Sequence, residues 1–571
     1  MDRFLGLEWH RFGAVVRPGV LLLLVLVLGV ASVTAVDARA QDSFQAFESG
    51  PVRPLALSPD GSRLFATNTP AGTLEVFDVN GGQLVHAHSV PVGLEPVAVA
   101  ARTSSEVWVV NHLSDSVSIV NLGASPPAVI RTLLVGDEPR DIVFAGTGDS
   151  RAFITTAHRG QQRTHASIAA VPGAGDPQLT TPGVPRADVW VFDAGSLGTT
   201  IGGTPVAILS FFADTPRALA VSPDGGTVYV AAFHSGNQTT AINDTLVPDG
   251  FDSAGPAGNG APGGVPGPSA NVFGDPAPET GVIVKFDGSS WRDAVGRSWD
   301  ALVPFDLPDH DVFAFDANTL APGTIFDHVG TILFNMVTNP VNGKVYVTNT
   351  ELPNHIRFEG PGEHGGSTVQ GHLSESRISV LDPSGPSVDA QHLNQHIDYG
   401  KLHTDVPDLV DPTLKNHSLA TPLQPIVSSD GSTLYVAAFG SGRIGVFDTA
   451  AIEAADFESS FDPTVESARY ITTPGGPAGL VLDESTPESP RLYALTRFDN
   501  QVIVIDPNSK SVLATHALPD PEPLHVVEGR RFLYDAVETS GNGEASCSSC
   551  HIFGDMDSLA WNLGDPDAPS S

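Results

Sequence analysis

The stretch RALAVSPDGGTVYVAAF, residues 217–233, decides the fold. It reads as a short apolar strand, a turn built on Pro, Asp and Gly, and a second apolar strand. Similar pairs recur as PLALSPDGSRLFATN at 54–68, FNMVTNPVNGKVYVTN at 334–349 and QPIVSSDGSTLYVAAF at 424–439. Weaker copies occupy 96–111, 139–156 and 477–496. A pattern that returns in this way predicts an array of similar structural units.

A third strand that ends in Asp or Asn follows each pair, and a fourth apolar run then leads into the next unit. The third strands include SVSIVN at 116–121, DVWVFD at 188–193, RIGVFD at 443–448 and QVIVID at 501–506. Each unit therefore has four strands in about 45 residues. One such sheet cannot bury its faces alone, whereas several sheets packed in a closed ring can, and closure protects their edges. The repeat predicts a mainly β protein with a seven-bladed β-propeller, and residues 217–334 have room for an eighth blade.

The residues YVTN at 346–349, the SPDG turns and third strands such as VSIVN resemble the YVTN family of β-propeller repeats. The resemblance covers roughly residues 48–520 and implies a propeller fold, but the activity stays open because propellers host many functions. We expect the ring to close through residues 43–50 together with the last strands before 520.

Long insertions fall at one kind of position in the repeat. They lie between the second and third strands of units three, four and five, at 159–186, 235–280 and 351–375, and between units five and six at 383–421. In a propeller these junctions open on the same face, so one face is elaborated while the other keeps tight turns. Long loops on a rigid scaffold often carry binding sites.

Histidines are frequent at the same junctions. His112, His158 and His234 each lie at or just past the end of a second strand. Seven more lie between 355 and 417: His355, His364, His372, His392, His396, His403 and His417. They form either a metal site or haem-facing surface, or a set of solvated loop histidines, since no pair has the spacing of a zinc or 2-His-carboxylate motif. Calcium is a weak candidate ligand because the acidic loop residues lack the alternating pattern of an EF-hand. These acidic residues are Asp244, Asp249 and Asp252.

The chain is strongly acidic. Its formal net charge is −36, from 29 Lys and Arg against 65 Asp and Glu. Phosphate binding needs clustered basic side chains, so this balance argues against nucleic acid and anionic membranes as partners. An acidic surface that keeps the protein soluble is the simpler interpretation.

The N-terminus has the pattern of an export signal. Arg3, Arg11 and Arg17 precede the apolar run VLLLLVLVLGV at 20–30, and a small-residue site ends at Ala40. An apolar core of about 11 residues is shorter than the roughly 20 needed to span a bilayer. We expect residues 1–40 to be a cleaved signal peptide, with no stable membrane span afterwards and a mature protein in the periplasm or outside the cell. An uncleaved anchor is the alternative, since the mildly apolar stretch extends to Val36.

The stretch GNGEASCSSCHIFGDMD at 541–557 contains the only two cysteines of the chain, Cys547 and Cys550, with His551 directly after them. In a CxxCH motif the two thiols form thioether bonds with the vinyl groups of haem, and the histidine ligates the iron. Zinc would need a second pair of ligands, a thioredoxin-like pair would need a βαβ setting, and so small a disulfide loop would constrain the unfolded chain little. The motif therefore predicts covalent haem c at Cys547 and Cys550, with His551 as proximal iron ligand.

The run VEGRRFLYDAVETSGNGEASCSSCH at 527–551 resembles the start of the bacterial di-haem cytochrome c peroxidase family. The matching residues are Gly529, Phe532, Tyr534, Asp535, Ser546, Cys547, Cys550 and His551. The resemblance implies a haem module that exchanges electrons with a redox partner protein and that reduces peroxide or oxidises the partner. Residues 523–536 have a second interpretation, as a shortened propeller repeat with an apolar strand, a Gly turn and an aromatic strand.

The predicted haem segment is short. A cytochrome c domain needs about 80 residues or more to wrap its haem, whereas only residues 552–571 follow the motif. The resembling family also has a second CxxCH motif and a calcium site between its haems, and neither is visible. We therefore expect a signal at 1–40, a propeller at 41–520 and a truncated haem segment at 521–571.

The distal haem ligand is open at this point. Met556 lies too close to His551 in sequence to reach the opposite haem face readily, which leaves a propeller histidine or a partner. Trp561 is expected to pack against the haem or the propeller.

Three functions remain open from the sequence. The first is an exported haem protein in electron transfer, as part of a peroxidase-like oxidoreductase. The second is a non-enzymatic propeller that binds a protein or another ligand. The third is a propeller enzyme whose loop histidines hold a metal. The substrate, the redox partner and the oligomeric state are not predicted.

Overall fold

The computed structural model describes residues 47–175, 185–250, 253, 255, 258–265, 273–275, 281–306, 308–357, 372–399 and 413–561. By its internal contacts the chain divides into two units, Met1–Phe47 and Glu48–Ser571. The expected signal peptide at 1–40 lies outside the described residues.

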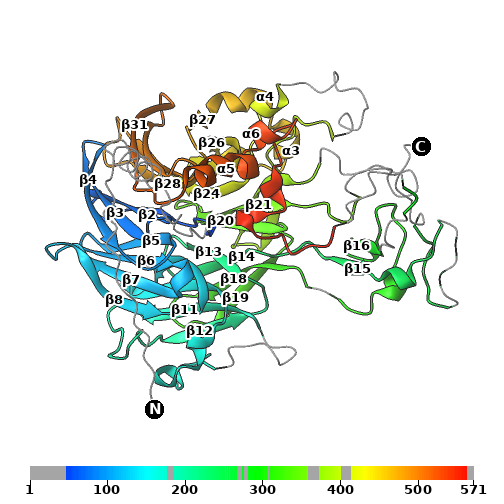
Figure 1. Cartoon of the computed structure of the whole chain (residues 1–571), viewed down its shortest axis with the longest axis horizontal. Coiled ribbons are helices and arrows are strands. Elements are labelled where there is room, and N and C mark those ends of the chain that lie inside the picture. The colour runs from blue at the N-terminus through cyan, green and yellow to red at the C-terminus, as the bar shows by residue number, and fades with distance from the viewer. Residues whose placement is uncertain are drawn as a thin grey trace, which may run out of the picture. The chain divides into compact units, whose positions relative to one another are not determined.

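Seven four-stranded antiparallel sheets are present in the described part of the chain, and together they are the blades of a β-propeller (Figure 1). Blade one consists of β1 Leu55–Leu57, β2 Arg63–Asn68, β3 Thr73–Asn80 and β4 Gln83–Pro91. Blade two consists of β5 Pro96–Thr103, β6 Glu106–Asn111, β7 Ser116–Asn121 and β8 Ala128–Leu134. Blade three consists of β9 Asp137–Ala145, β10 Arg151–His158, β11 Ala187–Asp193 and β12 Ala207–Phe211. Blade four consists of β13 Pro216–Val221, β14 Thr227–Ala232, β18 His310–Asp316 and β19 Pro322–Asp327. Blade five consists of β20 Ile332–Thr338, β21 Val345–Glu351, β22 Glu375–Asp382 and β23 Ser387–His392. Blade six consists of β24 Pro422–Val427, β25 Thr433–Ala438, β26 Arg443–Asp448 and β27 Ile471–Thr472. Blade seven consists of β28 Pro477–Asp483, β29 Arg491–Thr496, β30 Gln501–Asp506 and β31 Ser511–Ala517. The predicted mainly β propeller is confirmed.

The SPDG-type turns explain why the paired strands recur. In three blades a serine hydroxyl donates to an aspartate two residues later: Ser58 to Asp60 at 2.6 Å, Ser222 to Asp224 at 2.5 Å and Ser428 to Asp430 at 2.6 Å. The same serine oxygens accept the N–H that begins the second strand, from Arg63, Thr227 and Thr433. The glycine after each aspartate has a φ between 67° and 75°, a conformation that favours glycine over other residues. The motif is therefore a self-contained hairpin turn.

The innermost strands pack side by side in chain order, from β1 through β5, β9, β13, β20 and β24 to β28, and β28 lies against β1. The ring is thus closed by seven blades, and each blade takes all four strands from one stretch of the chain. The expected closure through residues 43–50 was wrong for the described part of that segment, because the last blade comes entirely from 477–517 and residues 47–50 are in no strand. Residues 43–46 lie outside the described residues.

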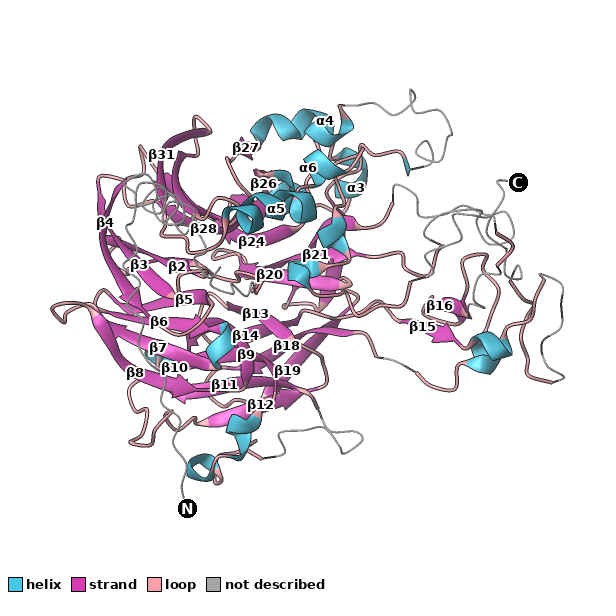
Figure 2. Cartoon of the chain, in the orientation of Figure 1, coloured by secondary structure: helices cyan, strands magenta, loops and turns pink. Residues whose placement is uncertain are grey.

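The room for an eighth blade is taken by an insertion in blade four. Strands β15 Thr239–Ile242, β16 Val282–Phe286 and β17 Trp291–Arg292 form a three-stranded sheet outside the ring, between β14 and β18 (Figure 2). We call these residues, 235–309, the insertion. Its small core surrounds the buried Trp291 and Trp299. Another expected loop, 383–421, holds the fourth strand of blade five, β23.

Helices are short and lie outside the blades. Blade six carries α2 Thr449–Ile452, α3 Phe457–Ser460 and α4 Pro463–Glu466, and after the last blade come α5 Leu524–Tyr534 and α6 Ala536–Thr539. None of the helices in the described residues is long and apolar enough to cross a membrane.

Residues 51–53 fill the centre of the ring. The Arg53 guanidinium donates to both oxygens of Asp141 in β9, at 3.1 and 3.0 Å, and to the carbonyl of Leu219 in β13 at 2.8 Å. Arg217 of β13 donates to the carbonyl of Pro51 at 2.8 Å. A segment that contacts the innermost strands of several blades must lie near the axis. The chain therefore plugs its own channel.

Gly479 of β28 gives a test of this central packing. A Cβ at this position would overlap the ring of Pro54, which follows the central segment. We expect Gly479→Ala to lower the free energy of unfolding by about 1–2 kcal/mol, because the closely packed interior has little room to yield. Urea titration would measure the change. The control is Gly385→Ala, where no atom lies within 4 Å of the added Cβ, and an equal loss in both variants would contradict the packing argument.

Candidate functional site

The C-terminal segment 523–561 lies on the face where the second and third strands of the blades are joined, which we call the loop face. Phe553 packs against Phe233, which follows β14, and against Phe439, which follows β25, with ring centroids 6.2 and 6.5 Å apart. The guanidinium of Arg217 lies 4.7 Å from the centre of the Phe553 ring. The segment that contains the CxxCH motif, at the red end of the chain in Figure 1, therefore lies over the ends of blades four and six, near the axis of the ring.

The first part of this segment is a helix, so its interpretation as a shortened propeller repeat was wrong. Helix α5, Leu524–Tyr534, buries Arg530 and Tyr534, four residues apart on one helical face. Arg530 donates to Glu48 at 2.8 Å and to Glu522 at 2.6 Å. Glu522 also accepts two hydrogen bonds from Arg497, at 3.0 and 3.1 Å. Two arginines and two glutamates thus hold α5 on the loop face.

Glu544 holds the second part of the segment. Its carboxylate is 1% exposed and accepts from His392 Nε2 at 2.9 Å, from Asn394 Nδ2 at 2.8 Å and from the backbone N–H of Ser376 at 3.2 Å. The Tyr399 hydroxyl donates to the other oxygen. All four partners belong to blade five or to the loop after it. Burial alone would lower the pKa of His392, but the Glu544 carboxylate outweighs burial and raises that pKa. Glu544 and His392 therefore form a buried ion pair three residues before the first cysteine.

The motif itself sits on a single turn. Residues Cys547–Ser549 form a 3-10 helix, and the backbone N–H of His551 donates to the carbonyl of Cys547 at 3.0 Å. Ser546 precedes the turn and donates its N–H to the Ser549 hydroxyl at 3.2 Å. This arrangement brings the two cysteines and His551 onto one short, capped piece of backbone.

The side chains of the motif differ in exposure, and both thiols are free. Both cysteines are free thiols; Cys547 is exposed and Cys550 is half-buried. The His551 imidazole is exposed and makes no hydrogen bond within the described residues. Burial, helped by nearby Asp557, raises the pKa of the Cys550 thiol to about 12. A thiol with so high a pKa is a poor nucleophile in disulfide exchange, which disfavours a thioredoxin-like redox pair.

Two thiols and an imidazole of this kind fit the attachment of haem c. Thioether bonds require two free thiols at this spacing, and an axial ligand requires an imidazole nitrogen that no other group occupies. The residues that follow the motif pack on the propeller, while Cys547 and His551 stay exposed and Cys550 stays half-buried. Ile552 is buried in the core, Trp561 Nε1 donates to Asp557 at 2.7 Å, and Asn354 donates to the carbonyl of Ala560 at 3.0 Å. Trp561 was expected to pack against the haem or the propeller, and it packs against the propeller core.

Three of the predicted histidines lie around the channel mouth. His112, His158 and His234 are at the ends of the second strands of blades two, three and four, where the sequence placed them. Burial, with the nearby Arg140, lowers the pKa of His112 to about 3 and that of His234 to about 4. Both imidazoles are therefore neutral at pH 7. The Nε2 atom of His234 is buried without a hydrogen-bond partner.

Most of the remaining described loop histidines pair with carboxylates, hydroxyls or other aromatic rings. His372 pairs with Glu375 at 2.9 Å and stacks on Tyr399, and His417 contacts the Ser467 hydroxyl at 2.6 Å. Within the described ranges, no group of three His, Cys, Asp or Glu side chains is placed to hold a metal ion. His364, His403 and Asp252 lie outside the described residues. Met556, which was weighed as a distal haem ligand, is 58% exposed.

Glu544 and the Glu48–Arg530 pair were missed by the sequence analysis. Glu544 lies close to the motif in sequence, but its partners lie about 150 residues earlier, at separations of 152 for His392 and 150 for Asn394. No local pattern signals such a pairing. The buried position of Arg530 could have been suspected from Tyr534 four residues later, once the segment is taken as a helix.

Comparison with solved structures supports the fold. Hydrazine synthase from Kuenenia stuttgartiensis is 16% identical, with a TM-score of 0.50, over 82% of this chain and 98% of that chain. This chain is a β-propeller protein. Two weaker matches are AztD from Citrobacter koseri, 12% identical with a TM-score of 0.34 over 82% and 86% of the two chains, and a functionally unknown protein from Desulfotomaculum acetoxidans, 13% identical with a TM-score of 0.38 over 79% and 94%. No protein-family model and no curated protein sequence matches the chain. At such low sequence identities, the similarity between this chain and these structures shows a shared fold but not a shared activity.

Proposed function

We propose that the chain is an exported β-propeller protein that carries one covalent haem c on its loop face and exchanges electrons with a partner protein. The observation that carries the proposal is the state of the motif: two free thiols and an unbonded imidazole on one capped turn, fixed to the propeller by Glu544. The N-terminal signal pattern supports a periplasmic or extracellular location, where c-type haem is attached in bacteria.

The residues of the motif would bind the haem, and the residues around it would hold the motif in place. Cys547 and Cys550 would hold the haem covalently, and His551 would donate Nε2 or Nδ1 to the iron as proximal ligand. When bound, haem c supplies a one-electron iron couple. The ion pair of Glu544 and His392 fixes the turn in position, and Phe553 and Ile552 anchor the chain just past the histidine in the propeller core.

Covalent haem is the first test. The full chain is expressed in a bacterium with c-type haem maturation, and the denatured protein is examined for haem staining and a Soret band. We expect both in the wild type and neither in the double variant Cys547→Ala/Cys550→Ala, because thioether bonds survive denaturation and other haem contacts do not. His525→Ala is the matched control, since His525 is exposed on α5 outside the motif. A folded wild type without covalent haem overturns the proposal.

The proximal ligand is tested by His551→Met in the same host. We expect the haem to stay covalently attached while its visible spectrum and midpoint potential change, because the axial ligand is one of the main determinants of haem potential. An unchanged spectrum would remove His551 from the iron. Peroxide reduction, implied by the resemblance to the di-haem peroxidases, is tested separately by hydrogen peroxide turnover with a reduced cytochrome as electron donor.

The other two functions receive less support. Metal-dependent catalysis by the loop histidines lacks a cluster of ligands in the described residues. A pure binding module is compatible with the fold, but it gives no role to the two free thiols.

A further inference from the structure

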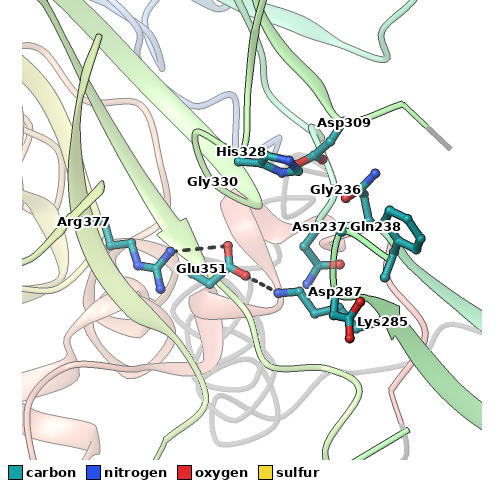
Figure 3. A pocket seen from close by; sticks show the side chains of 12 residues that line it. Gly236, Asn237, Gln238, Lys285, Asp287, Asp309, His328, Gly330, Glu351 and Arg377 are labelled. Atoms are coloured by element: carbon teal, nitrogen blue, oxygen red, sulfur yellow. Dashed lines mark hydrogen bonds and ion pairs between the residues drawn. The ribbon is translucent and has the colours of Figure 1, made fainter. Parts of the chain in front are cut away.

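A cavity of about 320 Å³ lies between the insertion and blades four and five (Figure 3). Lys285 and Phe286 of β16 form one wall. Glu351 at the end of β21 and Arg377 of β22 form the opposite wall, and Asp309 and His328 lie at the ends of β18 and β19 (Figure 3). The insertion is thus not only an outgrowth of blade four, since it completes a cavity on the propeller.

The charged groups of the cavity already have partners within the protein. One carboxylate oxygen of Glu351 pairs with Lys285 Nζ at 2.6 Å, and the other oxygen lies 3.7 Å from the Arg377 guanidinium. Asp309 contacts His328 Nδ1 at 2.5 Å. Arg292 donates to Asp287, the remaining carboxylate of the wall. A charged ligand would have to break one of these pairs, and an ion pair that loses one member at a half-buried site costs free energy.

A neutral ligand with many hydroxyl groups has no such cost. The carboxylate oxygens and backbone carbonyls can accept hydrogen bonds from hydroxyls, and the lysine, guanidinium and amide groups can donate to them. The half-buried ring of Phe286 packs against Trp291, with centroids 5.4 Å apart, and offers an apolar surface for the C–H groups of a sugar ring. The volume falls at the lower end of the range for small-molecule sites, about 300–1,000 Å³.

His328 is placed in the cavity by its backbone. Its φ of 61° is in the left-handed region, which is costly for a histidine. The buried carboxylate of Asp311 holds the next residues by accepting the N–H of Val329 at 2.5 Å and that of Gly330 at 3.4 Å. The imidazole side chain remains 69% exposed. The loop is therefore fixed so that a polar ring lines the cavity.

We propose that this cavity binds a small, uncharged saccharide of one or two rings. The proposal is independent of the haem. It assigns a role to the insertion, whose strand β16 supplies both a hydrogen-bond donor, Lys285, and an apolar ring, Phe286. Recognition would rest on the paired charges, which orient hydroxyls without attracting ions.

The test is calorimetry on the full chain with glucose, galactose, mannose, N-acetylglucosamine, cellobiose and chitobiose, and with glucuronate and succinate as charged probes. We expect saturable binding of at least one neutral sugar and none of the charged probes. Lys285→Met and Phe286→Ala should each weaken the binding by about tenfold or more, since each removes one direct contact. Lys344→Met is the matched control, because Lys344 is similarly half-buried, lies outside the cavity in the turn between β20 and β21, and pairs with Glu453 at 3.2 Å.

Two results would overturn the proposal. One is that no neutral sugar binds, or that a charged probe binds instead. The other is that a sugar binds but Lys285→Met and Phe286→Ala bind it as the control does. Circular dichroism of each variant checks that the propeller is folded, and the haem content reports on the other proposal separately.

Discussion

Glu544→Ala is expected to release the CxxCH segment from the loop face, with protease cleavage of residues 540–556 accelerated by more than about a hundredfold. The substitution removes the acceptor shared by His392, Asn394 and Tyr399. Breaking a buried ion pair by removing one partner costs about 3–5 kcal/mol, because the other charge is left uncompensated. A loss of about 3 kcal/mol in local stability raises the open population by roughly a hundredfold, and cleavage follows that population when opening is fast.

The segment should open locally rather than unfold the propeller. The blades are held by their own strand pairing and by the ring of innermost strands, and Glu544 contacts only the outer strands of blade five and the loop after it. The measurement is therefore limited proteolysis or hydrogen exchange of the segment, compared with urea unfolding of the whole protein. We expect the first to change strongly and the second little.

Glu538→Ala is the matched control for this experiment. Glu538 lies six residues before Glu544 on α6, is 53% exposed and pairs only loosely with Arg531, at 3.7 Å. Exposed pairs of this kind contribute about 0–1 kcal/mol. If both variants are cleaved at the wild-type rate, the anchoring role of Glu544 is refuted.

The propeller was predictable from the sequence because its signals are local. Each SPDG turn contains its own serine–aspartate hydrogen bond and its own glycine, so about five residues are enough to locate a hairpin. The third strands end in Asp or Asn for a similar local reason. Aspartates such as Asp316 and Asp382 accept N–H groups two residues further on and so end the strand.

What the sequence did not reveal depends on contacts between distant residues. The strand VIVKF at 282–286 has the pattern of a third blade strand, and only its pairing with β15 and β17 places it in the insertion. Helix α5 contains Gly529 and alternating apolar and aromatic residues, a pattern that also fits a hairpin. It is a helix because one face buries Arg530 against Glu48, which is 482 residues away in sequence. No local rule contains that partner.

The cysteines illustrate the same division. The spacing of Cys547, Cys550 and His551 pointed to haem without any structure, since the chemistry is contained in five residues. Their location over the channel mouth could not be derived, because it follows from Glu544 and from Phe553, whose partners are in blades four to six. The sequence thus predicts the group, and tertiary contacts determine where its predicted attachment residues are held.

The stability of the loop face should depend on pH through Glu95. This carboxyl lies near the network of Glu48, Glu522 and Arg497 below α5, and its Oε2 atom is buried without a hydrogen-bond partner. Burial raises the pKa of Glu95 to about 7; Arg497 and Ser49 oppose this rise, and Glu522 and Glu48 add to it. The folded protein therefore binds this proton more tightly than the unfolded chain does.

The sign of the effect follows from the linkage between protons and folding. A carboxyl with a raised pKa contributes stability that is fully present below the unfolded value of about 4.5 and is lost as the pH rises to about 7. A tenfold difference in proton affinity between the folded and unfolded states corresponds to about 1.4 kcal/mol, so between pH 5 and pH 8 the wild type should lose about 2–3 kcal/mol through this group. Glu95→Gln cannot ionise and should escape this loss.

Urea unfolding of the wild type and of Glu95→Gln at pH 5, 6, 7 and 8 would measure the difference. We expect the free energy of unfolding of the variant, relative to that of the wild type, to rise by about 2–3 kcal/mol across this range. Most of the change should be complete by the pH at which Glu95 is fully ionised. Glu488→Gln is the control, because Glu488 is exposed on blade seven and should follow the wild type. Parallel pH profiles for Glu95→Gln and the wild type would mean that Glu95 is ionised at low cost in the folded protein. The carboxyl would then have to be solvated or paired, and the network below α5 would have to be more open than its contacts indicate.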